Sequence, residues 1–387
     1  LRRKVMLYHS IFHNKFLSLL TFYLLLSSLQ AEKLPFYFYK RYEGLVNYTV
    51  PVVLYLNREG KRLKGYYYYE KSGIPFYLDG SVLEKDDKLI LNRFRFDGNT
   101  HSGGRILGSF QDVNKIEAEW NPKGSSKKFP VSLYETYASE TSSFSIEHFY
   151  KEVKIPAGKS SISAKVNITN LKLDSNIPNR GRVNSILFDK AKEVAANSLN
   201  IKPEILRKIK DKKDLAFQLI NDFKANLPDE EDPSASSEKV FHDLSQSLLF
   251  NEKDICTVVT RFNYYLGGAH PSRKTIFTVI DLGRGEVIDL DTFIELKDKT
   301  RLLPIAEKYF KRAIRLEAGK SYKEAGLLEN TFNLNDNFFV SKNAIGFYYN
   351  PYEIAPYAMG DISFVIPIRA LKDEIKGGRI ISLLENL

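Results

Sequence analysis

The sequence predicts an α+β protein: an all-β N-terminal meander, followed by a mixed α/β module with an antiparallel sheet and packed helices. Two observations predict this order. Short strand-like segments separated by turn residues fill residues 32–137. Apolar residues at helical spacing appear from residue 183 onward, among further strand-like segments. The chain of 387 residues is long enough for two or three domains.

The first 31 residues predict a secretory signal. Four basic residues and no acidic ones lie there, and residues 16–26, FLSLLTFYLLL, form an apolar run. This run is shorter than the roughly 20 residues that a membrane-spanning helix needs. Small residues before position 32 offer a cleavage point after Ala31, and an uncleaved membrane anchor is the alternative. We therefore expect a periplasmic or secreted protein.

Cysteine content and net charge further limit the cellular compartment and the partners that we expect for this protein. Cys256 is the only cysteine, so no intramolecular disulfide can form and stability must come from the core, which favours the bacterial envelope over animal secretion. The net charge is +10, and +6 remains after the first 31 residues. Basic and acidic residues are interleaved, which predicts a solvated surface with a mild attraction to anionic envelope polymers. Nucleic acid is not an expected partner of an exported chain.

Residues 32–137 carry the all-β pattern. Segments 52–56 and 63–69 flank turn residues 57–60 and predict a hairpin. Further strands are expected at residues 75–78, 88–95, 105–110, 115–120 and 129–133, with turns at 79–80, 97–99, 103–104 and 121–124. Regularly spaced short strands predict either a small barrel or a sandwich.

Four consecutive tyrosines follow Gly65 in this module. In a strand, Tyr66 and Tyr68 share one face and Tyr67 and Tyr69 the other, so one pair is expected in the core. The outward pair has two interpretations: surface packing, or a platform on which sugars stack.

The remaining chain divides at a polar linker, residues 138–145, into segments 146–265 and 266–387. The earlier segment predicts strands at 149–155 and 161–168, followed by a helix around residues 183–195. A second helix is expected from Pro203, with residues 215, 219, 220 and 223 on its apolar face. A mobile acidic loop at 227–239 and strands at 240–250 and 255–266 are expected after it. The later segment predicts a hairpin at 274–282 and 286–290, a helix at 298–316, and strands at 337–340, 344–349 and 362–368.

A family resemblance rests on five segments in this order: FNYYLGGAHP at 262–271, VIDLDTFI at 287–294, FFV at 338–340, IGFYY at 345–349 and NPYEIAPYAMG at 350–360. They resemble an extracytoplasmic domain of unknown function that occurs in lysozyme-sensing anti-sigma factors and beside some peptidoglycan deacetylase domains. Residues 146–262 are similar to its usual preceding partner domain. The tyrosine-rich module resembles a small bacterial envelope β module.

The resemblance implies an envelope module that binds lysozyme or a cell-wall glycan. Two departures limit it. A signal and a β module stand where the anti-sigma factors carry a cytoplasmic segment and a spanning helix, so transmembrane signalling is not implied. The sequence also lacks the metal-binding Asp-His-His pattern of a deacetylase.

Two short segments supply the candidate ligand-binding residues: Tyr264, Tyr265, Gly267, Gly268 and His270 in the first, and Tyr352, Glu353, Tyr357 and Asp361 in the second. The glycines permit positive φ or a close ligand approach. His270 either binds ligand or fixes a bend through a hydrogen bond to nearby backbone or carboxylate. The tyrosines suit recognition, or a structural loop.

The sequence shows weak support for catalysis. Glu353 and Asp361 are the candidate pair of catalytic carboxylates for glycoside hydrolysis, but nothing in the sequence indicates that they converge. No histidine has metal-ligand spacing, so neither a metal nor a cofactor is predicted. We therefore expect a noncatalytic envelope protein that binds a cell-wall glycan or a lysozyme-like protein; a peptidoglycan-modifying enzyme and a structural protein without ligand are the alternatives. Long-range repulsion disfavours a basic lysozyme unless the acidic residues 229–232 face it.

Overall fold

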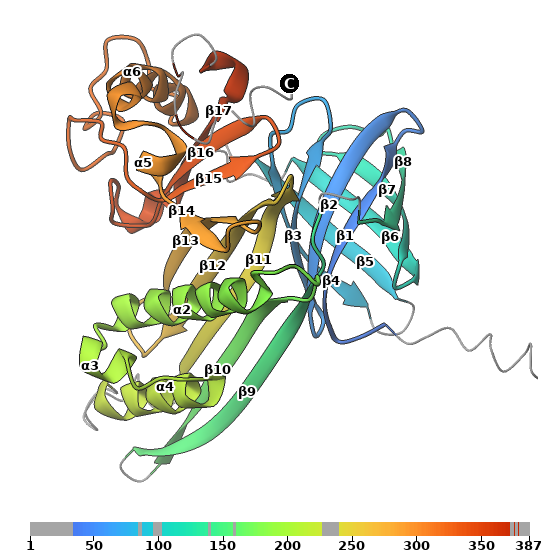
Figure 1. Cartoon of the computed structure of the whole chain (residues 1–387). Helices are drawn as coiled ribbons and strands as arrows, with labels where there is room; N and C mark the ends of the chain where they lie inside the picture. Colours follow the sequence, from blue (N-terminus) through green and yellow to red (C-terminus); the bar gives the residue numbers. More distant parts are fainter. Residues whose placement is uncertain are drawn as a thin grey trace, which may run out of the picture.

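The computed structural model describes residues 34–83, 87–95, 103–137, 141–157, 160–226 and 240–371, together with residues 375 and 378. It has the predicted α+β architecture. Figure 1 shows a closed barrel, a long six-stranded sheet beside it and a smaller three-stranded sheet. The predicted signal at 1–31, the turn at 97–99 and the loop at 227–239 lie outside the described residues.

The N-terminal module is a barrel and not a sandwich. Its antiparallel strands are β1 (Tyr37–Val46), β2 (Val50–Glu59), β3 (Arg62–Tyr69), β4 (Phe76–Leu83), β5 (Lys88–Arg95), β6 (Gly104–Asp112), β7 (Lys115–Pro122) and β8 (Phe129–Glu135). β1 pairs with β8 and closes the barrel. Alternate side chains point inward, and Tyr42, Leu54, Tyr67 and Trp120 are among those that fill the interior. The strand β1 was missed by the sequence pattern.

One predicted turn is wrong. Asp79 and Gly80 lie inside β4, where the sequence pattern predicts a chain reversal. A Cβ at Gly80 would lie 1.8 Å from the carbonyl oxygen of Ile90 on β5. The glycine therefore permits a close approach of two strands, which an Asp-Gly pair can do as well as turn the chain.

The second sheet has six strands in the order β14-β13-β12-β11-β10-β9. They are β9 (Phe144–Ala157), β10 (Ser160–Leu173), β11 (Val240–Glu252), β12 (Ile255–Tyr265), β13 (Ser272–Asp281) and β14 (Glu286–Ile288). All neighbours are antiparallel except β10 and β11, since the connection between these two crosses over through the helices. The boundary expected at 265/266 falls in the loop between β12 and β13, which are paired strands of this one sheet.

The crossover contains α2 (Arg180–Leu199), α3 (Pro203–Leu206) and α4 (Lys212–Asn226). The single second helix predicted from Pro203 is thus two helices. The Asp211 carboxylate accepts hydrogen bonds from the backbone N–H groups of Lys213 (2.8 Å) and Asp214 (2.9 Å), so it caps a new helix start. The predicted apolar face of α4 is confirmed as buried: Leu215, Leu219, Ile220 and Phe223.

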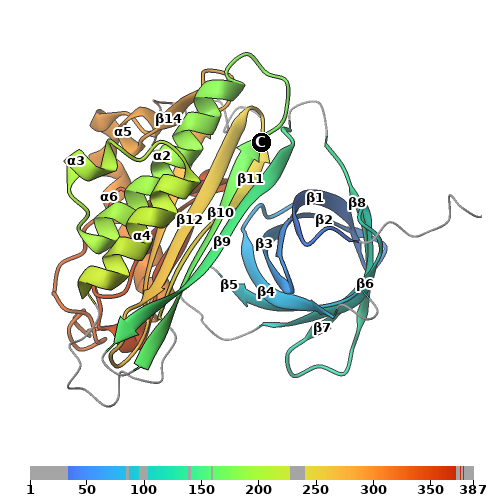
Figure 2. The same cartoon turned by 90° about the horizontal axis from the view of Figure 1, so that it is seen from below.

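The two faces of the six-stranded sheet differ in character. Val166 and Leu244 belong to the face that packs on α2 and α4 through an apolar core. Lys165, Asn167 and Asp243 belong to the opposite face, which is polar along this stretch and apolar where the barrel packs on it. Figure 2 shows the helices on one side of this sheet and the barrel on the other.

The C-terminal part forms a three-stranded sheet of β15 (Phe338–Ser341), β16 (Ala344–Tyr349) and β17 (Ile362–Pro367), with α5 (Leu290–Phe293), α6 (Leu296–Ala313) and the short 3-10 helices η2 (Tyr357–Met359) and η3 (Ile368–Ala370). The predicted helix and strands of this part are confirmed with small shifts at their ends. Thr257 of β12 donates a hydrogen bond to the Val340 carbonyl (2.7 Å), which ties this sheet to the central one. No helix in the described part of the chain is long and apolar enough to cross a bilayer.

The barrel packs on the central sheet through its tyrosines. Tyr55, Tyr66 and Tyr68 point out of the barrel and are fully buried, with no exposed area. They lie in the core shared with the central and C-terminal sheets. The sugar platform considered for the outward pair Tyr66 and Tyr68 is therefore wrong, because a second sheet covers them.

Glu252, at the end of β11, connects the three parts. Its carboxylate accepts hydrogen bonds from the Tyr68 hydroxyl and from Arg41 (3.2 Å), both on the barrel. Lys342 of the C-terminal sheet lies 3.7 Å from it and also pairs with Glu70 of the barrel. Arg41 is only 2% exposed, and Glu252 shares the neutralisation of this buried cation with Glu43, which lies 2.6 Å from the same guanidinium.

Glu252→Leu is expected to lower the free energy of unfolding by about 2–3 kcal/mol, because it leaves Arg41 and Tyr68 without this buried acceptor. Urea unfolding followed by fluorescence measures the change. Glu286→Leu, at the exposed start of the edge strand β14, is the matched control and is expected to change stability by less than about 0.5 kcal/mol. Equal losses for the two variants would contradict the role given to Glu252.

Candidate ligand-binding cleft

The Gly-Gly-Ala-His segment forms the loop between β12 and β13. The strand pairing ends at Tyr264 opposite Ser272. Gly267 and Gly268 have φ values of +102° and +101°, which side chains with a Cβ rarely adopt. A Cβ on Gly268 would meet nothing within 4 Å, so the backbone conformation and not crowding requires glycine. The predicted positive φ is confirmed.

Side-chain amides take the place of a neighbouring strand along part of β13. The side-chain oxygen of Asn350 accepts from the Thr275 N–H (2.6 Å), and that of Asn337 accepts from the Phe277 N–H (2.9 Å). Both amide groups also donate to the Thr275 carbonyl, at 3.1 and 2.9 Å respectively. Asn350 begins the NPYEIAPYAMG segment, so these bonds fix that segment against β13.

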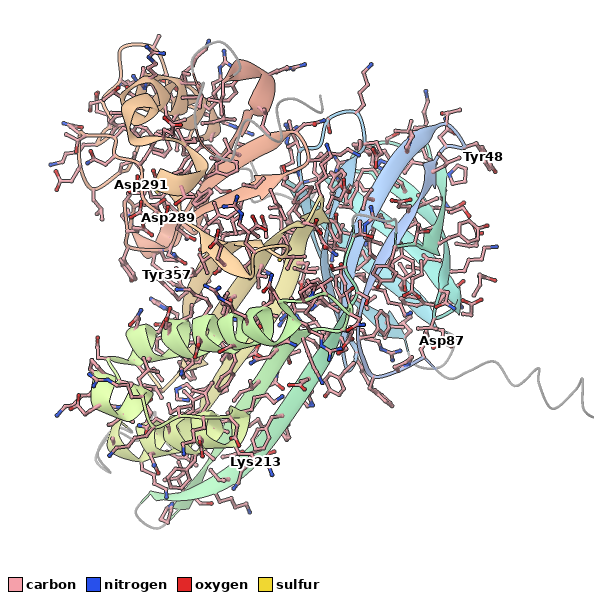
Figure 3. The ribbon with its side chains drawn as sticks, in the orientation of Figure 1. Tyr48, Asp87, Lys213, Asp289, Asp291 and Tyr357 are labelled. Carbon is pink, nitrogen blue, oxygen red and sulfur yellow. The ribbon has the colours of Figure 1, made fainter. Side chains whose placement is uncertain are left out.

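The two candidate segments meet at this edge. The His270 ring stacks on the Tyr357 ring with centroids 3.7 Å apart and planes 12° apart. The Tyr357 hydroxyl donates to the Pro271 carbonyl (2.9 Å), and Tyr352 lies beside Tyr357 with ring centroids 5.8 Å apart. His270 Nδ1 lies 3.1 Å from the same Pro271 carbonyl, which fits the predicted hydrogen bond to nearby backbone. We call His270, Tyr352 and Tyr357 the aromatic rim; Tyr357 is marked in Figure 3.

Of the remaining candidate residues, Asp361 also lies at this edge, whereas Glu353 and Tyr264 make contacts elsewhere. Asp361 pairs with Arg273 of β13 (3.0 Å). Glu353 instead accepts from the Asn350 N–H (2.9 Å), so it supports its own loop and does not share a partner with Asp361. Tyr264 turns toward the helices, where its hydroxyl donates to the Ser198 carbonyl (3.3 Å).

Tyr265 stabilises the loop between β12 and β13 and does not belong to the aromatic rim. Its hydroxyl donates to the Gly268 carbonyl (2.8 Å), and its ring lies 6.3 Å from Phe241 on β11. It therefore supports the loop that carries His270.

A cavity of about 370 Å³ lies where the barrel, the central sheet and the C-terminal sheet meet. We call it the junction pocket. Its lining residues are Arg62, Lys64, Tyr77, Asp79, Phe94, Arg95, Arg261, Asn263, Arg273, Thr275, Tyr348, Asp361 and Ser363. Five of these are basic and two are acidic, so the pocket attracts anions.

A second hollow of about 500 Å³ continues from the junction pocket across the uncovered polar face of the central sheet. We call it the sheet groove. Arg62, Asn263 and Arg273 line both spaces. One row of directly paired residues crosses five strands of the groove floor: Tyr150, Asn167, Asp243, Asn263 and Arg273. Tyr357 of the aromatic rim stands at the end of this row, also in the groove lining.

Most charges of the junction pocket are paired. Arg62 lies 3.3 Å from Asp79, and Arg273 pairs with Asp361. Burial raises the pKa of the Tyr348 phenol, and the Asp361 carboxylate raises it further, so this hydroxyl stays protonated. The pocket therefore offers neutral donors as well as cations.

Arg261 differs from the other cations of the pocket. Its guanidinium donates to the Tyr66 hydroxyl (2.8 Å) and lies 4.3 Å from the centre of the Tyr77 ring. No carboxylate of the described residues lies within ion-pair distance of it. Burial works against its charge, but the surrounding phenols and Asp361 raise its pKa overall, so it remains a cation.

The sequence pattern missed the junction pocket. Arg261 lies in TVVTRFNYY, which predicts a buried strand. A charged residue within such an apolar alternation was the available signal, because it must find a partner or a ligand. Arg62 and Tyr77 carry no comparable signal, since only the docking of the barrel brings them to Arg261.

The histidines and acids offer little chemistry. His242, on β11, faces the helix layer, where it is fully buried 3.4 Å from Asp222 and stacks on Phe223 at 4.0 Å. Burial lowers its pKa, so it is neutral at physiological pH. Among the residues with a described position, no group of three His, Cys, Asp or Glu side chains could hold a metal ion.

Comparison with known proteins assigns one part of the chain. Residues 292–369 match the family model described as a protein of unknown function (DUF3298). A crystal structure of a DUF3298 family member from Bacteroides fragilis NCTC 9343 is similar, with 18% identity, a TM-score of 0.50, and coverage of 64% of this chain and 100% of that chain.

Another, from Pseudomonas aeruginosa PAO1, has 15% identity, a TM-score of 0.45, and coverage of 60% and 94%. No curated protein matches the chain. At 18% identity the likeness to the Bacteroides fragilis structure concerns the fold alone.

Gly268→Ala is expected to lower the free energy of unfolding by about 1–2 kcal/mol, because alanine is strained at φ +101°. Thermal and urea unfolding check this. Gly181→Ala in α2 is the matched control: the site is equally open but helical, so the change is expected to be neutral or stabilising. An unchanged stability of Gly268→Ala would show that the loop relaxes to another conformation.

Proposed function

We propose that this protein is an exported, noncatalytic binding protein of the bacterial cell envelope that recognises an acidic cell-wall glycan. The observation that carries the proposal is the continuous surface formed by the sheet groove, the junction pocket and the aromatic rim. The resemblance to the extracytoplasmic domain of anti-sigma factors, with its partner domain and the preceding envelope module, supports the same cellular setting.

The sheet groove has the chemistry that sugars need. A sugar ring presents C–H faces, which pack on aromatic rings, and hydroxyls, which both donate and accept hydrogen bonds. Tyr150 is half exposed at one side of the groove, and Phe241 lines it. Asn167, Asp243 and Asn263 supply amide and carboxylate groups between them. The row of paired residues on its floor crosses five strands, which suits an extended polymer better than a compact ligand.

The charge of the junction pocket distinguishes an acidic glycan from a basic lysozyme as the partner. The junction pocket is lined by an excess of basic groups, so it attracts a polymer that carries carboxylates. The same excess repels a basic lysozyme. An acidic glycan is therefore the better match to this surface.

Binding fits the side-chain contacts better than hydrolysis does. Glycoside hydrolysis uses two carboxyl groups that flank one bond. Glu353 is engaged by the backbone of its own loop, and Asp361 is engaged by Arg273. Each carboxylate thus has a structural partner, and the noncatalytic function is favoured over a peptidoglycan-modifying enzyme.

Co-sedimentation of the purified protein with peptidoglycan sacculi tests the proposal. We expect saturable binding that weakens severalfold between about 50 and 300 mM salt, since exposed charges are screened. His270→Ala is expected to weaken binding severalfold with an unchanged melting temperature, because the ring is exposed and contributes little to the core.

Phe217→Ala is the control variant, because this exposed side chain lies on α4, on the opposite side of the central sheet. It is expected to bind as the wild type does. Immobilised lysozyme is tested in parallel. Binding to lysozyme but not to sacculi would overturn the glycan proposal, and equal binding by His270→Ala would remove the aromatic rim from the site.

A further inference from the structure

We propose that the junction pocket is a receptor for one carboxylate carried on a sugar ring, with Arg261 as the residue that binds it. This inference rests on the proposed glycan-binding function and specifies which chemical group of the glycan is selected. Arg261 lies outside both the family match and the two candidate segments, which contribute Tyr348, Asp361 and Ser363 to the pocket wall.

The guanidinium of Arg261 is already oriented. The Tyr66 hydroxyl accepts from one of its nitrogens, and the Tyr77 ring lies against its plane. Tyr66 is itself fully buried between the barrel and the central sheet, so it cannot move aside. A planar fork held in this way matches the two oxygens of a carboxylate, and little entropy is lost when the ligand arrives.

Arg261 makes no ion pair with a described carboxylate, whereas Arg62, Lys64 and Arg273 of the same pocket are paired with acids. The field of Asp361 and of the surrounding phenols favours the charge of Arg261, but no direct ion pair offsets the cost of burying it. Replacing it by an apolar residue on β12 would avoid this cost. Its presence in a pocket that opens to solvent is explained when an external anion completes the pair.

The walls of the pocket indicate a ring beside the carboxylate. Tyr77 and Phe94 pack together with ring centroids 5.9 Å apart and form an aromatic wall. Asn263 of β12 and Thr275 of β13 add polar groups to the lining. The volume of about 370 Å³ accommodates a ligand larger than a free ion. A carboxylated sugar satisfies both the cation and the aromatic wall.

The connection to the sheet groove gives the orientation of the polymer. Arg62, Asn263 and Arg273 line both spaces, so a sugar in the junction pocket is continuous with neighbouring sugars on the groove floor. The carboxylate then fixes the register of the chain, and the groove supplies the less specific contacts. Selectivity is expected to depend on Arg261 more than on any groove residue.

Titration calorimetry with N-acetylmuramic acid and N-acetylglucosamine tests this assignment, because the former carries a lactyl carboxylate and the latter does not. We expect the acid to bind at least about tenfold more tightly to the wild type. Arg261→Gln is expected to abolish that preference. Arg284→Gln, an exposed arginine on the turn before β14, is the charge-matched control and should retain it.

Arg261→Lys keeps the charge and removes the planar fork, so it should show an intermediate preference and serves if the glutamine variant does not fold. Glucuronic acid against glucose distinguishes the source of the carboxylate: a preference there as well indicates a general carboxylate receptor, and its absence restricts the pocket to the lactyl group. Equal binding of acid and neutral sugars by the wild type, or an unchanged preference in folded Arg261→Gln, overturns the assignment. Sacculus binding that persists in Arg261→Gln would leave the glycan-binding function standing without this pocket.

Discussion

The docking of the barrel onto the central sheet determines the rest of the structure. Tyr55, Tyr66 and Tyr68 lose all their exposed area there, and burying such large side chains dominates the energetics of an interface. Glu252 also restrains the orientation of the barrel, because its carboxylate accepts hydrogen bonds from Tyr68 and Arg41 of the barrel. These contacts hold the parts in one orientation. The junction pocket exists only in that orientation, since each part contributes residues to its wall.

The central sheet uses its two faces for different purposes. One face is sealed by α2 and α4 through an apolar core, which gives the sheet its stability. The other is covered by the barrel over only part of its length, and the uncovered part carries polar residues in cross-strand rows. A rigid sheet that presents an open row of polar and aromatic side chains is a suitable floor for an extended ligand, because its side chains are positioned before binding.

Local patterns predicted most elements, and long-range packing explains what they missed. Alternation identified the barrel strands, but Gly80 was misread because its role is a close contact with β5. The sequence marked His270 and Tyr357 as members of two separate candidate segments, but it did not predict that their rings stack. The side-chain amides of Asn337 and Asn350 bring the two segments together. The burial of Tyr66 and the site around Arg261 depend on sequence-distant parts, so no local pattern contains them.

Amide hydrogen exchange of the protein, with and without solubilised peptidoglycan glycan strands, tests the central claim most directly. The account predicts that protection on binding is concentrated in residues 62–79 and 88–95, which include the barrel wall of the junction pocket, in the loop at 266–271, and in the segment at 350–361. The remaining barrel strands and α4 should exchange unchanged. Protection confined to the far side of the barrel or to the helix layer, with saturable binding, would contradict the assignment of the cleft as the binding site.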